Sequence, residues 1–287
     1  QAVGDAARVA IGQIGVAHAT DPLGRHARRG SLAAAKGLAA MGHDWASVRI
    51  ASLLSAQDPA TRGRAAEALR HFWDFSGGGL GGAADAQAAS HLARALGDRD
   101  RGVRIQAALA LAEFPGGSAA SALRSAMARA NPSTRAWFAA ALLAQGAAAG
   151  GRTSAADASA WDALDHVASS SDPELRRSAA QALAWLDRPE GAWLAARLAN
   201  DRDAAVRLAG AKALVHARGE DGARLLVQLA GEGRATEAVA ALDAVGGRDH
   251  RGQDLVDAAR EHRDIRVRWA AERLVLRASR FGIAIAR

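Results

Sequence analysis

An acidic residue followed four positions later by an arginine recurs along this 287-residue chain. The stretch 98–104 reads DRDRGVR, and later stretches read DPELRR (172–177), DRDAAVR (201–207) and DIRVR (264–268). The fork of donors on arginine binds carboxylates and phosphates, so the pairs could form a repeated ligand site. They could also form a repeated structural contact, because Asp and Asn cap helix N-termini. The pattern around the pairs decides between the two.

The pairs belong to a longer repeat. When each arginine is taken as position 0, alanine stands at +4, leucine at +7, and Asp or Asn at −4 in five copies. The acidic or amide residues and their arginines are Asp58 and Arg62, Asp100 and Arg104, Asn131 and Arg135, Asp172 and Arg176, and Asp203 and Arg207. Weaker copies begin at 21–25, at 231–242, where the arginine is lost, and at 264–275, which we interpret as slipped by one residue. The copies lie about 28 to 42 residues apart, the range of two-helix repeats.

The composition indicates an all-α protein. Alanine dominates the apolar residues, favours helices and lets them approach closely, and no stretch has the alternating period of a strand. Each copy predicts a helix A, a tight turn carrying the acidic residue, and a helix B. Two glycine-rich stretches, 76–82 and 146–157, predict loops inserted between repeats.

Residues 172–183, DPELRRSAAQAL, resemble the short bacterial HEAT-like repeat, D-P-x-[VL]-R-x-x-A-A-x-A-L. The resemblance covers about residues 20–280. It implies an all-α, right-handed α-solenoid of about eight two-helix repeats, with residues 1–287 forming a single domain. It also implies that the turn Asp caps helix B and that the arginine reaches along the stack to a neighbouring turn, so that the pairs are a structural ladder.

The residue types give no enzyme signature. Cysteine is absent, which excludes disulfides, thiolate metal ligands and a thiol nucleophile. Neither glycine-rich stretch is followed by Lys-Ser/Thr as a phosphate loop requires. The pair Asp162 and His166 is typical of a helix surface rather than of a metal site. We therefore expect no catalytic residues, no metal and no cofactor.

The formal net charge is +7, and acidic residues interrupt the basic ones. This surface admits an anionic partner, although arginine is also common in proteins of high-GC genomes. The sequence begins at Gln1 and lacks cysteine, features that favour an exported protein with a processed N-terminus. No run of about 18 uncharged apolar residues predicts a membrane span.

Large side chains recur on one face of the predicted B helices. Position +9 points away from the core positions 0, +3, +4, +7 and +11, and position +2 lies on the same side. The residues on this face, which we predict to contact a partner protein, are His71, Trp137, Trp185, His216 and Trp269.

These features predict a non-catalytic scaffold or adaptor that binds another protein through the solenoid surface, within a multi-subunit complex. Other proteins with HEAT-like repeats leave two alternatives. One is a nucleic-acid-binding protein with a groove like that of the alkylpurine DNA glycosylases. The other is a protein similar to the bilin lyases, which act on phycobiliproteins.

Overall fold

The computed structural model describes most of the chain from residue 50 to residue 280. The described residues are 25–26, 31, 33–34, 37, 48, 50–76, 83–114, 117–148, 155–186, 188–218, 220–229, 235–245 and 253–280. The chain divides into two compact units, residues 1–161 and 162–287. That the whole chain forms one solenoid stays a prediction.

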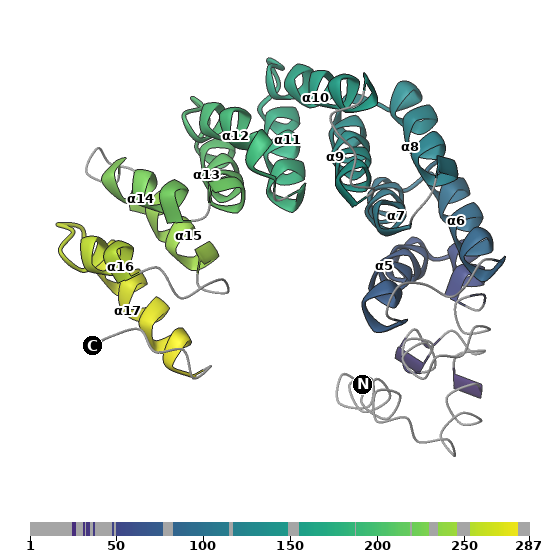
Figure 1. Cartoon of the computed structure of the whole chain (residues 1–287), viewed down its shortest axis with the longest axis horizontal. Helices are drawn as coiled ribbons and strands as arrows, with labels where there is room; N and C mark the ends of the chain where they lie inside the picture. The colour runs from purple at the N-terminus through teal and green to yellow at the C-terminus, as the bar shows by residue number, and fades with distance from the viewer. Residues whose placement is uncertain are drawn as a thin grey trace. The chain divides into compact units, whose positions relative to one another are not determined.

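Residues 1–161 contain two layers of helices (Figure 1). The short 3-10 helix η2 (Leu53–Ser55) precedes α5 (Pro59–Ser76), α6 (Ala83–Ala95), α7 (Arg101–Glu113), α8 (Gly117–Arg129) and α9 (Pro132–Ala148). The B helices α5, α7 and α9 pack side by side in one layer, and the A helices α6 and α8 pack in the other. Helix α10 (Ala155–Ala168) lies at the boundary between the two units.

Residues 162–287 repeat the same arrangement. The elements after α10 are α11 (Pro173–Leu186), η3 (Pro189–Gly191), α12 (Ala192–Ala199), α13 (Ala204–Arg218), α14 (Glu220–Leu229), α15 (Ala235–Val245), α16 (Gln253–Arg260) and α17 (Ile265–Arg280). The B helices α11, α13, α15 and α17 pack in sequence, and α12, α14 and α16 supply the A layer. Within each unit, the described residues confirm the predicted all-α solenoid of two-helix repeats.

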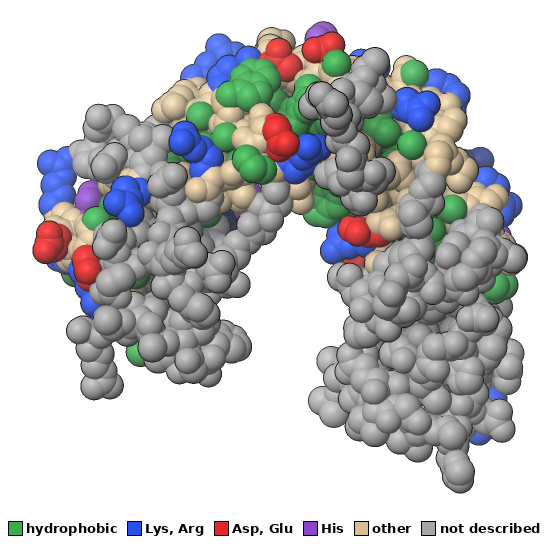
Figure 2. All heavy atoms as spheres, viewed as in Figure 1, with side chains coloured by type: hydrophobic (Ala, Val, Ile, Leu, Met, Phe, Trp, Pro, Cys, Tyr) green, Lys and Arg blue, Asp and Glu red, His purple; other side chains and the backbone are tan. Residues whose placement is uncertain are grey.

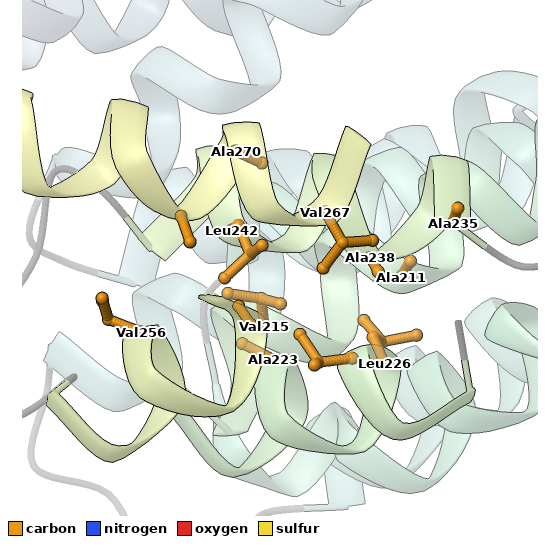
Figure 3. Packing of buried hydrophobic residues seen from close by; sticks show 13 residues of the cluster. Ala211, Val215, Ala223, Leu226, Ala235, Ala238, Leu242, Val256, Val267 and Ala270 are labelled. Atoms are coloured by element: carbon orange, nitrogen blue, oxygen red, sulfur yellow. The ribbon is translucent and has the colours of Figure 1, made fainter. Parts of the chain in front are cut away.

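The aligned columns of the sequence are the core of the repeats. The alanines at +4 are fully buried, and the leucines at +7 are at most 4 % exposed. Figure 3 shows how this continues in the last repeats, where Val215, Leu226, Leu242 and Val267 point toward one another between the layers. A small residue at +4 lets the two layers approach, and the leucine fills the space between them.

The predicted insertions are shorter than the sequence indicates. Helix α5 continues to Ser76, α9 continues to Ala148 and α10 begins at Ala155. What remains of the two insertions, and most of the first predicted copy near residues 21–32, lies outside the described residues. None of the described helices combines the length and the apolarity that crossing a bilayer requires.

Candidate interaction surface

The residues at −4 cap the B helices. Asp100 adopts an extended backbone conformation, and its Oδ1 accepts a hydrogen bond from the backbone N–H of Val103 at 3.0 Å. Asp58 accepts from the N–H of Thr61 at 2.9 Å, and Asp203 accepts from Ala205 at 2.9 Å. Each contact satisfies a donor that the first turn of a helix leaves free, which is the role that the HEAT-like resemblance implies.

The arginines at position 0 bind the turn of their own repeat. Nη1 of Arg62 donates to the carbonyl oxygens of Ala56 and Gln57, both at 2.8 Å. The same two contacts, to the carbonyls at −6 and −5, recur at Arg104, Arg176, Arg207 and Arg268. Because Arg268 makes them in register, the last copy is not slipped by one residue as the sequence indicates, and Trp269 lies at position +1.

Two of these arginines also bind the turn of the next repeat. Arg62 holds Asp98 through Nε at 2.7 Å and Nη2 at 2.9 Å. Arg176 holds Asp201 in the same bidentate way, at 2.6 and 2.8 Å. These hydrogen bonds keep the pKa of both carboxyl groups below its usual value of 3.8. The four side chains are largely buried, so the pairs connect neighbouring repeats through shielded charges.

The carboxylates that join repeats are not the ones that the sequence pattern singles out. Asp98 and Asp201 lie at −6, two residues before the capping residue. The acceptor of Arg207 lies at neither of these positions. Its Nε donates at 2.9 Å to Glu237, which lies buried within helix α15. The two aspartates of DRD at 98–100 and 201–203 could have indicated this contact from the sequence. The second Asp caps its own helix, and the first accepts hydrogen bonds from the arginine of the preceding repeat.

The predicted B-helix face is only partly accessible. Trp137, Trp185 and His216 are half-buried, and the side chain of His71 lies outside the described residues. Trp185 and His216 occupy position +9 of α11 and α13, two helices that pack against each other. Trp269 is 64 % exposed, and at +1 it points about 80° away from the +9 direction. That these residues contact a partner stays a prediction.

The most exposed apolar residues gather on α17. Ile265, Trp269 and Leu276 are 49 %, 64 % and 62 % exposed, and their spacing of four and seven residues places them within about 40° on the helix. The opposite face of α17 is buried through Val267, Ala270 and Ala271. Helix α17 therefore has one apolar face in the core and a second apolar stripe, which we call the α17 stripe, at the surface.

A second exposed tryptophan lies on the other layer. Trp193 in α12 is 53 % exposed, and the guanidinium of Arg197 lies 5.6 Å from its ring centroid. Arg197 also binds Asp165 on α10 and Ser169 directly after that helix. The sequence pattern places Trp193 in an A helix but does not distinguish it from core residues. Trp193 is exposed because Leu194, Leu198 and Ala199 form the buried face of α12, which leaves Trp193 on the other side of the helix.

Comparisons with known proteins find one matching protein family and several similar solved structures. Residues 161–246 match the family of HEAT repeats, which confirms the predicted HEAT-like repeats there. A similar solved structure is the complex of CpcE and CpcF of phycocyanin lyase from Nostoc sp. PCC7120, with 19 % identity, a TM-score of 0.44 and coverage of 83 % of this chain and 90 % of that chain. Another is an archaeal HEAT-like repeats protein from Thermococcus onnurineus NA1, with 17 % identity, a TM-score of 0.33 and coverage of 91 % and 97 %. No curated protein sequence matches significantly.

Proposed function

From a fold built of HEAT-like repeats, we propose that this protein is a non-catalytic scaffold or adaptor that binds another protein within a larger assembly. The observation that carries the proposal is the α17 stripe. Contiguous exposed apolar side chains mark binding surfaces in soluble proteins, and tryptophan is enriched among the residues that dominate interface energies. The described residues provide no covering for Trp269.

In α5 and α7, the positions that correspond to Trp269 and Leu276 of the α17 stripe face the neighbouring helices. A Cβ at Gly63, at +1 of α5, would contact the side chain of Val103 in the next B helix at 4.0 Å. In α7 the residues at +1 and +8, Ile105 and Ala112, are buried. The same positions in α17 are Trp269 and Leu276. A partner that covers the stripe would therefore take the place that a following B helix takes inside the array.

The charges beside the stripe indicate the chemistry of that partner. Arg268 donates through Nη1 to the carbonyls of His262 and Arg263, and no described residue accepts from its Nε or Nη2. Arg62 and Arg176 use these two donors to hold the carboxylate of the next repeat. The partner surface should thus combine apolar side chains that pack on Trp269 with an acidic side chain that reaches Arg268.

Replacement of Trp269 by serine tests the proposal. The tagged wild-type protein and the variant are purified from the native cells, and the proteins retained with each are identified by mass spectrometry. We expect the variant to keep the wild-type Tm and to lose a specific partner, with an affinity loss of roughly 2 kcal/mol or more once that partner is purified.

Trp193→Ser is the matched control, because it removes an exposed tryptophan from the A-helix layer. It should retain the partner. If Trp193→Ser loses the partner and Trp269→Ser does not, the interface lies on the A helices and the assignment to α17 is wrong. If neither variant changes what is retained, or if the stripe mediates only self-association by size-exclusion chromatography, the adaptor proposal fails.

A further inference from the structure

At the step between α7 and α9, the ladder has a basic residue in the place of the carboxylate that joins other repeats. At the corresponding place, position −6 of the copy that begins α9, the chain has Arg129 where other copies have Asp98 and Asp201. The capping residue of the same copy is Asn131 rather than Asp. Relative to the other two turns, this turn therefore has lost both carboxylates and gained a guanidinium.

Arg104 is the arginine that this turn leaves without its usual acceptor. Its Nη1 donates to the carbonyl oxygens of Asp98 and Arg99 at 2.8 and 3.0 Å, as in the other repeats. Among the described residues, none accepts from its Nε or Nη2. The nearby Asp98 already receives Nε and Nη2 of Arg62, and Asp100 caps α7. The hydrogen bonds of Nη1 hold the guanidinium of Arg104 in place, and its Nε and Nη2 are oriented so that they can bind an oxyanion.

A cavity of about 630 Å³ lies at this step. It opens between the α6–α7 repeat and the α8–α9 repeat, within residues 1–161. Its lining includes Arg94, Arg104 and Arg129 together with the apolar Leu96 and Phe138, and it includes no Asp or Glu. Arg94 contacts His91, whereas Arg129 has no acceptor among the described residues. The volume falls within the range of small-molecule sites and exceeds what one side chain fills.

We propose that this cavity binds a carboxylate, with the Nε and Nη2 of Arg104 as the bidentate donors and Arg129 as the second cation. The ladder itself supports carboxylate as the ligand, since the same two donors of Arg62 and Arg176 hold Asp98 and Asp201. The source is either a small organic acid or an acidic side chain of a bound polypeptide. The site is independent of the α17 stripe, which lies in residues 162–287.

Substitution of Arg129 by aspartate gives the sharpest test. In R129D the chain again carries an acid at −6, which should occupy Arg104 as Asp98 occupies Arg62. We expect R129D to raise the Tm and to abolish binding of succinate, measured by isothermal titration calorimetry with succinamide as the neutral counterpart. Arg124→Asp is the control, because Arg124 is an exposed residue of the same helix outside the cavity lining and the charge change is identical. It should leave the succinate affinity within about twofold.

Further ligands and one further variant complete the experiment. Arg129→Gln, which removes one cation and adds no acid, should weaken succinate about tenfold. Binding of succinate assigns the site to a free acid, and binding of an acetylated, amidated glutamate peptide in its place assigns it to a polypeptide side chain. Tighter binding of inorganic phosphate than of either carboxylate overturns the proposal. It is also overturned if wild-type protein binds neither carboxylate, or if R129D and R124D bind them equally.

Discussion

A single arginine side chain in this protein holds two turns. Arg176 donates to the carbonyls of Ser170 and Ser171 in its own turn and to the carboxylate of Asp201 in the next one. Arg176 is only 6 % exposed, and its hydrogen bonds to these oxygens offset the cost of burying its charge. Removal of the side chain takes hydrogen bonds away from two carbonyls and a shielded carboxylate, and the loss of donors to shielded acceptors is costly.

Arg176→Ala should therefore lower the free energy of unfolding by roughly 1–3 kcal/mol, measured by urea denaturation. Arg177→Ala is the control: this neighbour is half-buried and pairs with Glu174 across one helical turn, so it does not connect repeats. Its effect should stay within about 0.5 kcal/mol. Wild-type stability in Arg176→Ala, combined with lost partner binding, would show that the ladder is a ligand site instead.

The same pairs predict how stability depends on pH. Hydrogen bonds from Arg62 and Arg176 lower the pKa of Asp98 and Asp201 in the folded protein, so the unfolded chain binds their protons more readily. The stabilisation is complete above the unfolded pKa of about 4 and is lost as the pH falls through the lower folded pKa. We expect the Tm to decrease on acidification below about pH 4.

Asp201→Asn should lower the Tm at neutral pH and make its decrease in acid less steep, because one of the groups that drive it is absent. Asp162→Asn, at an exposed position of α10, should leave the wild-type profile unchanged. Equal slopes for Asp201→Asn and wild type below pH 4 would contradict the linkage.

At the scale of elements, the close approach of α12 and α13 depends on a glycine. A Cβ added at Gly210 in α13 would lie 2.4 Å from the backbone nitrogen of Ala199 at the end of α12. Real Cβ atoms do not approach backbone so closely, so the two helices would have to separate. At Gly117, the first residue of α8, a Cβ would meet nothing within 4 Å.

Gly210→Ala should therefore destabilise the protein by about 1–3 kcal/mol despite the higher helix propensity of alanine. Gly117→Ala should be neutral within about 0.5 kcal/mol. Thermal unfolding followed by circular dichroism distinguishes the two. A Tm for Gly210→Ala equal to or above that of wild type would show that α12 and α13 do not approach as described.

The helices could be predicted well from the sequence because the residues that pack in the core occupy the same positions in each repeat. Alanine at +4 and leucine at +7 are buried in all five strong copies, which is why their alignment locates the B helices. The last copy was misaligned because Glu272 and Val275 replace those two residues, although Asp264 and Arg268 remain in register. Helix ends at the insertions were also missed, since Gly146 and the alanines after it continue α9 without a breaker.

The candidate surface was harder to predict than the fold. The position of a residue in the helical period identifies the face of the helix on which it lies. The exposure of its side chain also depends on which helix packs against that face. Trp185 and Trp269 illustrate this: the first is half-buried beside its neighbouring repeat, whereas the second is exposed on α17. The carboxylates at −6 were missed because they connect repeats, and a single-repeat pattern does not contain that contact.

For the whole molecule, the net charge of +7 admits nucleic acid as an alternative partner. On the face shown in Figure 2, however, basic side chains lie in separate groups with acidic ones between them. Several arginines are also committed to ion pairs, among them Arg188, Arg197 and Arg260. The described residues on this face therefore form no continuous basic track of the kind that phosphate contacts use.

We therefore expect only weak binding to duplex DNA, equal for unrelated sequences and lost between low and physiological salt. Fluorescence anisotropy with two unrelated duplexes across a salt series measures this. A preference for one duplex, or for one that contains a damaged base, that persists at physiological salt would favour the glycosylase-like alternative over the adaptor.

The contact from an arginine to the next turn gives the two repeats that it joins complementary ends. In the pairs of Arg62 with Asp98 and of Arg176 with Asp201, the earlier repeat supplies the cation and the later repeat supplies the anion. A cut between the two members of either pair would thus leave an unmatched guanidinium at the end of the earlier fragment and an unmatched acid at the start of the later fragment. An acidic first turn attracts the basic last turn of another fragment, whereas two first turns or two last turns repel each other. The ladder therefore also determines the direction in which repeats, or separate pieces of the array, can be joined.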